Sequence, residues 1–174
     1  MPNFRKTVFS TLLATTIAFG GIGMVYASSP AKQEALNKTT VSAVQAIETA
    51  TAHVAGEATE VDFKHKKSMS YYEVDIIANG QKHEISIDAT TGKILGSKAK
   101  QDKKAQHRPA IKVSLQQAIG IAQAKTGGKV KEAELKYKSG QPRYKVETLV
   151  DGQEHNTIID ANSGQVLGSQ IDIG

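Results

Sequence analysis

Cysteine is absent from this chain of 174 residues, and its absence excludes several kinds of chemistry. The chain has no means of forming a disulfide framework, a thiolate metal site, a cysteine nucleophile or a lipid-modified N-terminal cysteine. Tryptophan is also absent, and aromatic residues make up only 5% of the sequence. The length allows one ordinary domain or two small ones. An apolar share of 39% with 22% charged residues is typical of a folded globular protein.

The first 27 residues have the composition of an export signal. Arg5 and Lys6 precede an apolar run over residues 8–19, glycines follow at positions 20, 21 and 23, and Val25-Tyr26-Ala27 has the residue sizes that signal peptidases read. We predict cleavage after Ala27 and a secreted or cell-envelope location for the rest of the chain. The alternative is an uncleaved membrane anchor, because a stretch of ~20 residues is long enough to cross a bilayer.

Positive charge is concentrated in one short segment. The formal net charge of +5 falls to +3 when Arg5 and Lys6 leave with the signal, and residues 98–108 alone contribute +4 from five basic residues against Asp102. The rest of the mature chain therefore sums to −1. This distribution argues against a basic nucleic-acid-binding face on a folded domain. We interpret residues 98–112 as a basic linker that is able to associate peripherally with membrane or anionic wall polymer.

The chain contains an internal repeat. A shift of 72 residues lays residues 41–97 over residues 113–169 without a gap, and 23 of the 57 aligned positions are identical. Such self-similarity indicates two copies of one structural unit. We divide the chain into a signal peptide (1–27), an N-terminal segment (28–40), repeat 1 (41–97), the basic linker (98–112) and repeat 2 (113–174).

Each repeat is expected to begin with a helix. Ser42 with Gln45, and Ser114 with Gln117, have the spacing of a capping box, in which each side chain accepts a hydrogen bond from the other residue's backbone N–H. Apolar residues then recur at helical spacing. They are Ala43, Ala46, Ile47 and Ala50 in repeat 1, and Leu115, Ala118, Ile119 and Ala122 in repeat 2. We expect Gly56 and Gly127-Gly128 to end these helices, because glycine accepts the left-handed conformation at a helix end.

The remainder of each repeat alternates apolar and polar residues with period two, which indicates half-buried strands. Asn79-Gly80 and Asp151-Gly152 are strong hairpin signals, since a type I′ turn needs positive φ at both central residues. The predicted fold class is α+β, with two tandem repeats that each pack one helix on an antiparallel meander of three to four strands. A unit of about 60 residues is marginal alone. We therefore expect the two copies to support each other or to be stabilised by a partner.

The repeat resembles the PepSY domain. The resemblance is carried by the helix that starts at Ser114, by Gly128-Lys129-Val130, by Tyr144-Lys145-Val146-Glu147, by the Asp151-Gly152 hairpin and by the closing segment 159–167. Repeat 1 has the same close over residues 87–95, and it departs from the family pattern at residues 66–70. The resemblance implies a non-catalytic extracytoplasmic binding module, with regulation of a peptidase as one role.

The titratable residues do not form a recognisable catalytic or metal-binding pattern. The five histidines lie outside any short ligand spacing, and we interpret His83 and His155, which are repeat equivalents, as strand residues with a backbone or carboxylate partner. A metal site between the repeats is the minor alternative. The acidic pairs Asp62/Glu134 and Asp75/Glu147 are expected on solvated outer faces, pairing across strands with Lys64 and Lys136. A cation- or substrate-binding patch is the alternative for them.

Two further pairs are retained in both repeats. We expect Asp88 and Asp160 to accept hydrogen bonds from the backbone of the glycine-closed turn that follows each of them. We expect Tyr72 and Tyr144 to be core residues, because they share strand parity with Val74 and Val146. The sequence thus gives no catalytic, cofactor-binding or metal-ligating residue to assign, and we do not predict an enzyme.

The leading functional hypothesis is a non-catalytic secreted or cell-envelope protein that binds or inhibits an extracytoplasmic protein such as a peptidase. A meander leaves an edge strand, and edge strands can capture an extended chain. The alternative is an accessory of an envelope sensor that binds a metal ion, a peptide or an anionic wall polymer.

Overall fold

The computed structural model describes residues 28–102, 105 and 108–172, and the predicted signal peptide lies outside them. A short helix opens this part of the chain, and each repeat then contributes one helix followed by four strands. The helices are α1 (Pro30–Asn37), α2 (Ala43–His53) and α3 (Leu115–Thr126). The strands of repeat 1 are β1 (Glu57–Lys66), β2 (Met69–Ala78), β3 (Gln81–Asp88) and β4 (Ile94–Gln101). Those of repeat 2 are β5 (Lys129–Lys138), β6 (Gln141–Val150), β7 (Gln153–Asp160) and β8 (Val166–Asp172).

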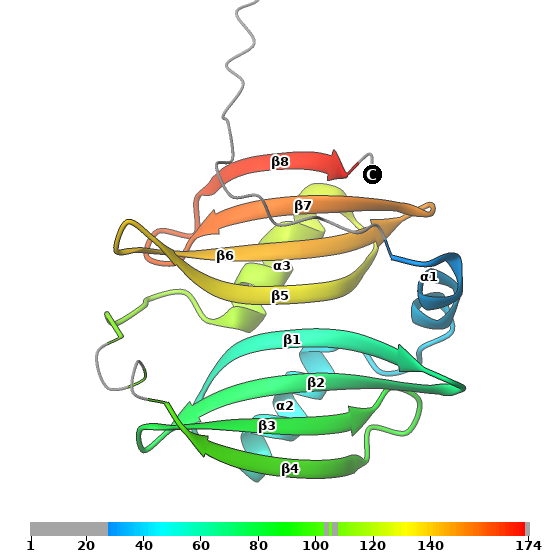
Figure 1. Ribbon diagram of the computed structural model, residues 1–174. Helices are drawn as coiled ribbons and strands as arrows, with labels where there is room; N and C mark the ends of the chain where they lie inside the picture. Colours follow the sequence, from blue (N-terminus) through cyan, green and yellow to red (C-terminus); the bar gives the residue numbers. More distant parts are fainter. Residues whose placement is uncertain (1–27, 103–104, 106–107, 173–174) are drawn as a thin grey trace, which may run out of the picture.

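All eight strands form one antiparallel sheet in the order β4-β3-β2-β1-β5-β6-β7-β8. Figure 1 shows α2 and α3 on the same face of this sheet, while the other face carries neither of them. The predicted α+β class is confirmed. The expectation that the two repeats support each other is also met, because the first strand of repeat 1 pairs directly with the first strand of repeat 2.

The two repeats meet at a short symmetric junction, which we call the seam. Glu60 pairs with Glu134, Val61 with Ala133, and Asp62 with Glu132. Val61 and Ala133 are repeat equivalents, so the seam is centred on a local two-fold axis that relates one repeat to the other. The arrangement is that of a self-complementary dimer interface built within a single chain.

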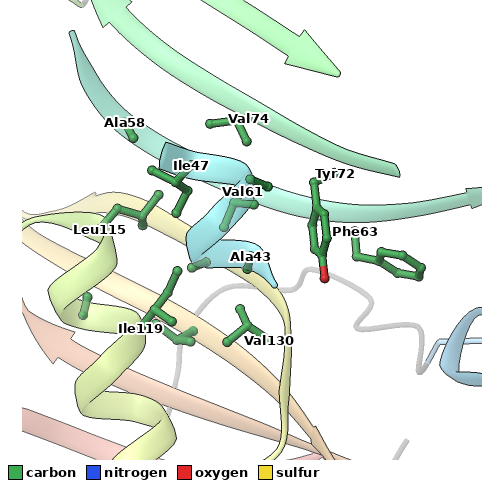
Figure 2. Close-up of a cluster of buried hydrophobic side chains, with 14 of the residues drawn as sticks. Ala43, Ile47, Ala58, Val61, Phe63, Tyr72, Val74, Leu115, Ile119 and Val130 are labelled. Carbon is green, nitrogen blue, oxygen red and sulfur yellow. The ribbon is translucent and has the colours of Figure 1, made fainter. Parts of the chain in front are cut away.

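One hydrophobic core runs beneath both repeats. It joins the apolar faces of α2 and α3 to inward-facing residues of β1, β2 and β5, as Figure 2 shows for Ile47, Leu115, Ile119, Val61 and Val130. Tyr72 and Tyr144 are buried in this core, as predicted. Because the core crosses the seam, each repeat buries apolar surface that it would expose if it were alone.

The local signals that set the helix starts and hairpins are confirmed. Both capping boxes are present, and the central residues of both predicted hairpins have positive φ. Gly127 ends α3 with φ 74°, as expected. The expectation for Gly56 is wrong, because α2 ends on Val54 in an extended conformation. Gly56 is needed for close approach instead, since an added Cβ would lie 2.5 Å from the carbonyl oxygen of Ile77.

Two features depart from the expected domain plan. The N-terminal segment contains α1, which the sequence did not indicate because its apolar residues are few. Ser29 caps this helix, and Leu36 is its buried residue. The linker also starts later than residue 98, since Lys98–Gln101 continues β4 and pairs with β3. No helix among the described residues is both long and apolar enough to span a membrane.

Candidate functional site

The sheet face opposite α2 and α3, which we call the open face, is lined with charged side chains. Carboxylates face each other across the seam, Glu60 opposite Glu134 and Asp62 opposite Glu132. Lys64 pairs with Asp62, and Lys136 lies 2.9 Å from Glu134, so each lysine neutralises a carboxylate of its own strand. The seam is therefore an acidic strip with cations at its margins.

Burial and like charge perturb the carboxyl groups at the centre of this strip. Burial, reinforced by Asp75 and Glu134, raises the pKa of Glu60 from 4.5 to about 8. Burial also raises the pKa of Glu132, with Glu147 and Asp62 as further causes. Folding thus disfavours the ionised form of these two groups. When they are ionised, they destabilise the pairing of β1 with β5, which joins the repeats.

Because of this cost, we expect Glu60→Gln to raise the free energy of unfolding by an amount that depends on pH. A carboxyl whose pKa is higher in the folded state destabilises that state only after it ionises in the unfolded chain, above about pH 4.5. We expect the variant and the wild type to have the same free energy of unfolding at pH 4. Above that pH the variant should become increasingly more stable than the wild type, up to about pH 8. The plateau of this gain should be about 1–2 kcal/mol, because solvent screens this partly exposed group. Urea unfolding at pH 4, 6 and 8 measures it.

The matched control is Glu48→Gln, which removes the same charge from the exposed side of α2. It should shift stability by less than about 0.5 kcal/mol at every pH. A Glu60→Gln gain that is equal at pH 4 and pH 8 would contradict the assignment.

A buried ionic cluster lies beside the seam in repeat 2. The Lys131 ammonium is 2.7 Å from carboxylate oxygens of both Glu147 and Glu154, and Lys145 contacts the other oxygen of Glu147. Burial alone would lower the pKa of Lys131 and raise those of the two glutamates. The mutual hydrogen bonds overcome this effect, so the pKa of Lys131 is raised and both carboxyl pKa values are lowered. The cluster is ionised and closely paired.

A β-bulge positions the lysine of this cluster. Val130 pairs with Thr148 and Glu132 with Glu147, which leaves Lys131 as the extra residue of β5. Bulges redirect side chains in this way. Repeat 1 has the same bulge at Thr59, between Ala58 and Glu60.

The equivalent site in repeat 1 has a different distribution of charge. Asp75 occupies the position of Glu147 and is paired with Lys82, which stands where repeat 2 has Glu154. Thr59 stands where repeat 2 has Lys131 and hydrogen-bonds the Asp75 carbonyl. Asp75 and Glu147 are thus equivalent buried carboxylates that each pair with a lysine. In repeat 1 the lysine comes from the third strand, and in repeat 2 it comes from the bulge.

The expectation for the acidic pairs is wrong in two respects. Asp75 and Glu147 do lie on the face away from the core stripe, but they are only 6% and 3% exposed, because long lysine side chains cover them. Lys64 and Lys136 pair along their strands and not across them. The alignment of the two repeats did contain a signal for the buried cluster. From repeat 1 to repeat 2, a neutral residue becomes a lysine (Thr59 to Lys131) while a lysine becomes an acidic residue (Lys82 to Glu154). The bulge that brings these positions close had no sequence signal.

The predicted turn aspartates behave as expected. One carboxylate oxygen of Asp88 accepts from Thr90 N and Thr91 N at 2.9 and 2.7 Å, and Asp160 accepts equivalently from residues 162 and 163. These backbone hydrogen bonds lower the pKa of both groups. Their role is structural, since they close the turns before β4 and β8.

Among the residues that the structure describes, the histidines are not brought into a common site. His83 and His155 are half-buried, and they lie on β3 and β7, which are separated by the four strands β2, β1, β5 and β6. His65 contacts the Ser70 hydroxyl at 3.0 Å, and His107 lies outside the described residues. No group of three metal-ligating side chains is found in the part of the chain that the structure describes.

A small apolar hollow of about 160 Å³ lies where the start of α2 faces α3, with Tyr72, Ile119 and Val130 in its wall. Sites for cofactors and drug-sized ligands are typically about 300–1,000 Å³. The hollow therefore has room for a single side chain and not for a cofactor.

The two ends of the sheet present unequal edges. Among the strands that the structure describes, β4 and β8 are the outermost, and each has one neighbouring strand. β4 is exposed along its whole length and carries Lys98 and Lys100. At the equivalent positions β8 has Gln170 and Asp172, and between them Ile171 is 44% exposed. Lysines on an edge oppose pairing with another chain, so β8, which carries none, is less protected than β4 against addition of a strand.

A protein-family comparison matches the chain twice. The model for the PepSY family, described as the peptidase propeptide and YPEB domain, matches residues 40–98 and 112–170. These ranges agree with the two repeats. None of the curated proteins matches the chain.

Solved structures give more distant similarities. A candidate lipoprotein from Clostridium difficile 630 is 20% identical, with a TM-score of 0.49, over 77% of this chain and 95% of that one. The YpmB protein from Bacillus subtilis is 19% identical, with a TM-score of 0.34, over 72% and 96%. The YpeB C-terminal domain of Bacillus megaterium is 17% identical, with a TM-score of 0.33, over 79% and 68%.

Proposed function

The chain belongs to the PepSY family of peptidase propeptide and YPEB domains, and from this membership we propose that it is an exported, non-catalytic protein that binds another protein. A peptidase of the envelope or the medium is the first candidate partner, because the family is named for peptidase propeptides. The proposed location follows from the signal-like residues 1–27. Function depends on the site and not on the fold alone, so the proposal needs a specific surface.

The observation that carries the proposal is that β8 is an outermost strand of the described sheet, with β7 as its neighbour there. An unpaired edge offers a row of backbone N–H and C=O groups to which an extended peptide can add as a further strand. Ile171 provides an apolar contact for a side chain of that peptide, and no lysine lies on β8 to repel it. The proposed partner therefore presents an extended segment with an apolar side chain.

Photo-crosslinking in cells that export the protein tests this surface. A photoreactive amino acid is placed at Gln170 on β8, or at its repeat equivalent Lys98 on β4 as the matched control. We expect a crosslinked peptidase from position 170 and little or none from position 98. Identical products from both positions, or none from position 170, would count against the β8 edge.

A variant with an altered edge connects binding to activity. Q170K/I171K places lysines on β8 as on β4, and both positions are exposed, so the change should leave folding intact. Added wild-type protein should lower the activity of the crosslinked peptidase, and the double variant should do so at least 10-fold less effectively. No change in peptidase activity with either protein would leave binding without regulation and would overturn the regulatory part of the proposal.

A second candidate function rests on the opposite edge. Lys98 has a side chain that is 84% exposed, and with Lys100 it forms a basic edge that continues into the basic linker. Such a run suits an anionic wall polymer. Calorimetry with a polyglycerol phosphate at low salt should detect binding that K98E/K100E abolishes, and the absence of heat at millimolar ligand would eliminate this candidate.

A further inference from the structure

The segment that follows the predicted signal is anchored onto the folded repeats. The Ser28 N–H donates to Oε1 of Glu154 at 3.1 Å, and the Lys32 ammonium lies 3.7 Å from Asp62. At the other end of α1, Leu36 is 1% exposed. The segment thus runs from β7 to β1, and Figure 1 shows α1 beside the strand ends at one end of the seam.

Lys129 fixes the C-terminal end of α1. Its ammonium donates to the carbonyl oxygens of Leu36, Asn37 and Thr39 at 3.2, 2.8 and 2.8 Å. A cation at this position satisfies helix carbonyls that lack intrahelical partners and opposes the negative end of the helix dipole. Lys129 therefore holds the C-terminal end of the segment in place, and the hydrogen bond from Ser28 to Glu154 holds its N-terminal end.

Glu154 is a buried acceptor for the Ser28 backbone N–H. Its side chain is only 4% exposed, and its other oxygen is 2.7 Å from Lys131. That lysine is shared with Glu147, which has Lys145 as a second cation. Glu154 therefore shares its one paired lysine with Glu147, whereas Glu147 pairs with two lysines. The second oxygen of Glu154, Oε1, accepts the hydrogen bond from the Ser28 nitrogen.

The sequence independently predicts that Ser28 becomes the first residue after export. We propose that cleavage of the Ala27–Ser28 bond creates an α-ammonium group that pairs with Glu154 and holds residues 28–37 against the two repeats. This inference rests on the proposed export. In the cleavage, a signal peptidase adds water across the amide: the C–N bond breaks, Ala27 gains a carboxylate, and the Ser28 nitrogen gains hydrogen and is protonated at neutral pH. The buried carboxylate then receives a charged donor in place of a neutral one.

The assignment explains why repeat 2 differs from repeat 1 at this position. Lys82, the equivalent of Glu154, pairs with Asp75, so this position of repeat 1 has a cation where repeat 2 has a carboxylate. The exchange to Glu154 and the accompanying Lys131 create a binding site for an amino group on one repeat only. That site lies beside the β8 edge, because Glu154 pairs with Asp172 in the sheet.

Hydrogen exchange of the exported protein tests whether the ion pair between the Ser28 ammonium and Glu154 holds residues 28–37 in place; we call this contact the lock. The chain is purified from the medium or envelope, and its first residue is read by mass spectrometry. It is then compared with the same chain acetylated at the Ser28 nitrogen, which keeps an N–H donor but removes the charge. We expect exchange in the peptide covering residues 28–37 to become about 5- to 10-fold faster on acetylation, as a charge-assisted hydrogen bond is replaced by a neutral one.

Glu154→Gln supplies the second arm. In this variant acetylation should change the exchange rate less than 2-fold, since the acceptor is no longer charged. If that variant fails to fold, a chain extended by Gly-Ser before Ser28 replaces it and should exchange like the acetylated chain. A first residue other than Ser28 would overturn the proposal, as would equal exchange in the free and acetylated chains. Partner crosslinking at Gln170 does not depend on these readouts, so its failure is distinguishable from failure of the lock.

Discussion

Replacing Lys131 by alanine should cost about 3–5 kcal/mol of unfolding free energy, because it leaves two buried carboxylates without their shared cation. Lys131 is itself 7% exposed, and both of its partners are less exposed. Loss of one member of a buried ion pair is much more costly than loss of a surface pair. Guanidinium unfolding followed by circular dichroism measures the change, with Lys136→Ala, which disrupts a half-exposed pair, as a control expected to lose less than about 1 kcal/mol.

The repeat itself suggests a rescue of this variant. K131T/E154K transfers the arrangement of Thr59 and Lys82 from repeat 1 into repeat 2, so that a cation from β7 reaches Glu147. We expect the double variant to be more stable than either K131T or E154K alone, with a coupling of at least 1 kcal/mol. Recovery should be incomplete because Ser28 loses its acceptor. Additive losses would show that the two arrangements are not equivalent.

Gly128→Ala should destabilise the protein by about 3 kcal/mol or more. Gly128 has φ 77°, and an added Cβ would lie 2.2 Å from the carbonyl oxygen of Leu149 and 2.7 Å from Val150 Cγ2. The left-handed conformation costs a residue with Cβ about 1–2 kcal/mol, and overpacking against backbone adds about 1–3 kcal/mol. Thermal and urea unfolding of the variant provide the measurement.

Gly120 offers a control within α3. Nothing lies within 4 Å of a Cβ at that position, so Gly120→Ala should stabilise the helix by about 0.5–1 kcal/mol. A loss of less than 1 kcal/mol in Gly128→Ala would mean that β5 and β6 approach each other less closely than described.

Signals that act within a few residues were sufficient to predict most of the fold. The capping boxes at Ser42 and Ser114 fix the helix starts, and the turns at Asn79-Gly80 and Asp151-Gly152 fix the hairpins, because the physics of each is local. The repeat indicated that the two units are alike. It did not indicate that their first strands would pair at Val61 and Ala133, since edge-to-edge pairing has no local signature.

The functional surface was less predictable for the same reason. Glu154 and Lys131 are 23 residues apart and meet only because a bulge turns one of them, and Ser28 is 126 residues from its acceptor. Helix α1 is short and weakly amphipathic, so its stability depends on tertiary contacts such as Lys129 and not on its own sequence. Contacts of this kind become visible only when strand order and register are known.

The pairing of the two repeats into one sheet underlies every surface described above, and engineered cysteines test it directly. The chain has no native cysteine, so E60C/E134C introduces the only two thiols. Directly opposed residues have Cβ atoms about 4.5–5.5 Å apart, close to the range that a disulfide needs. We predict an intramolecular disulfide on mild oxidation of E60C/E134C and D62C/E132C, and none in E60C/K136C, where the residues are diagonal. Disulfide formation in the diagonal pair alone, or in none of the three, would contradict the seam and the account built on it.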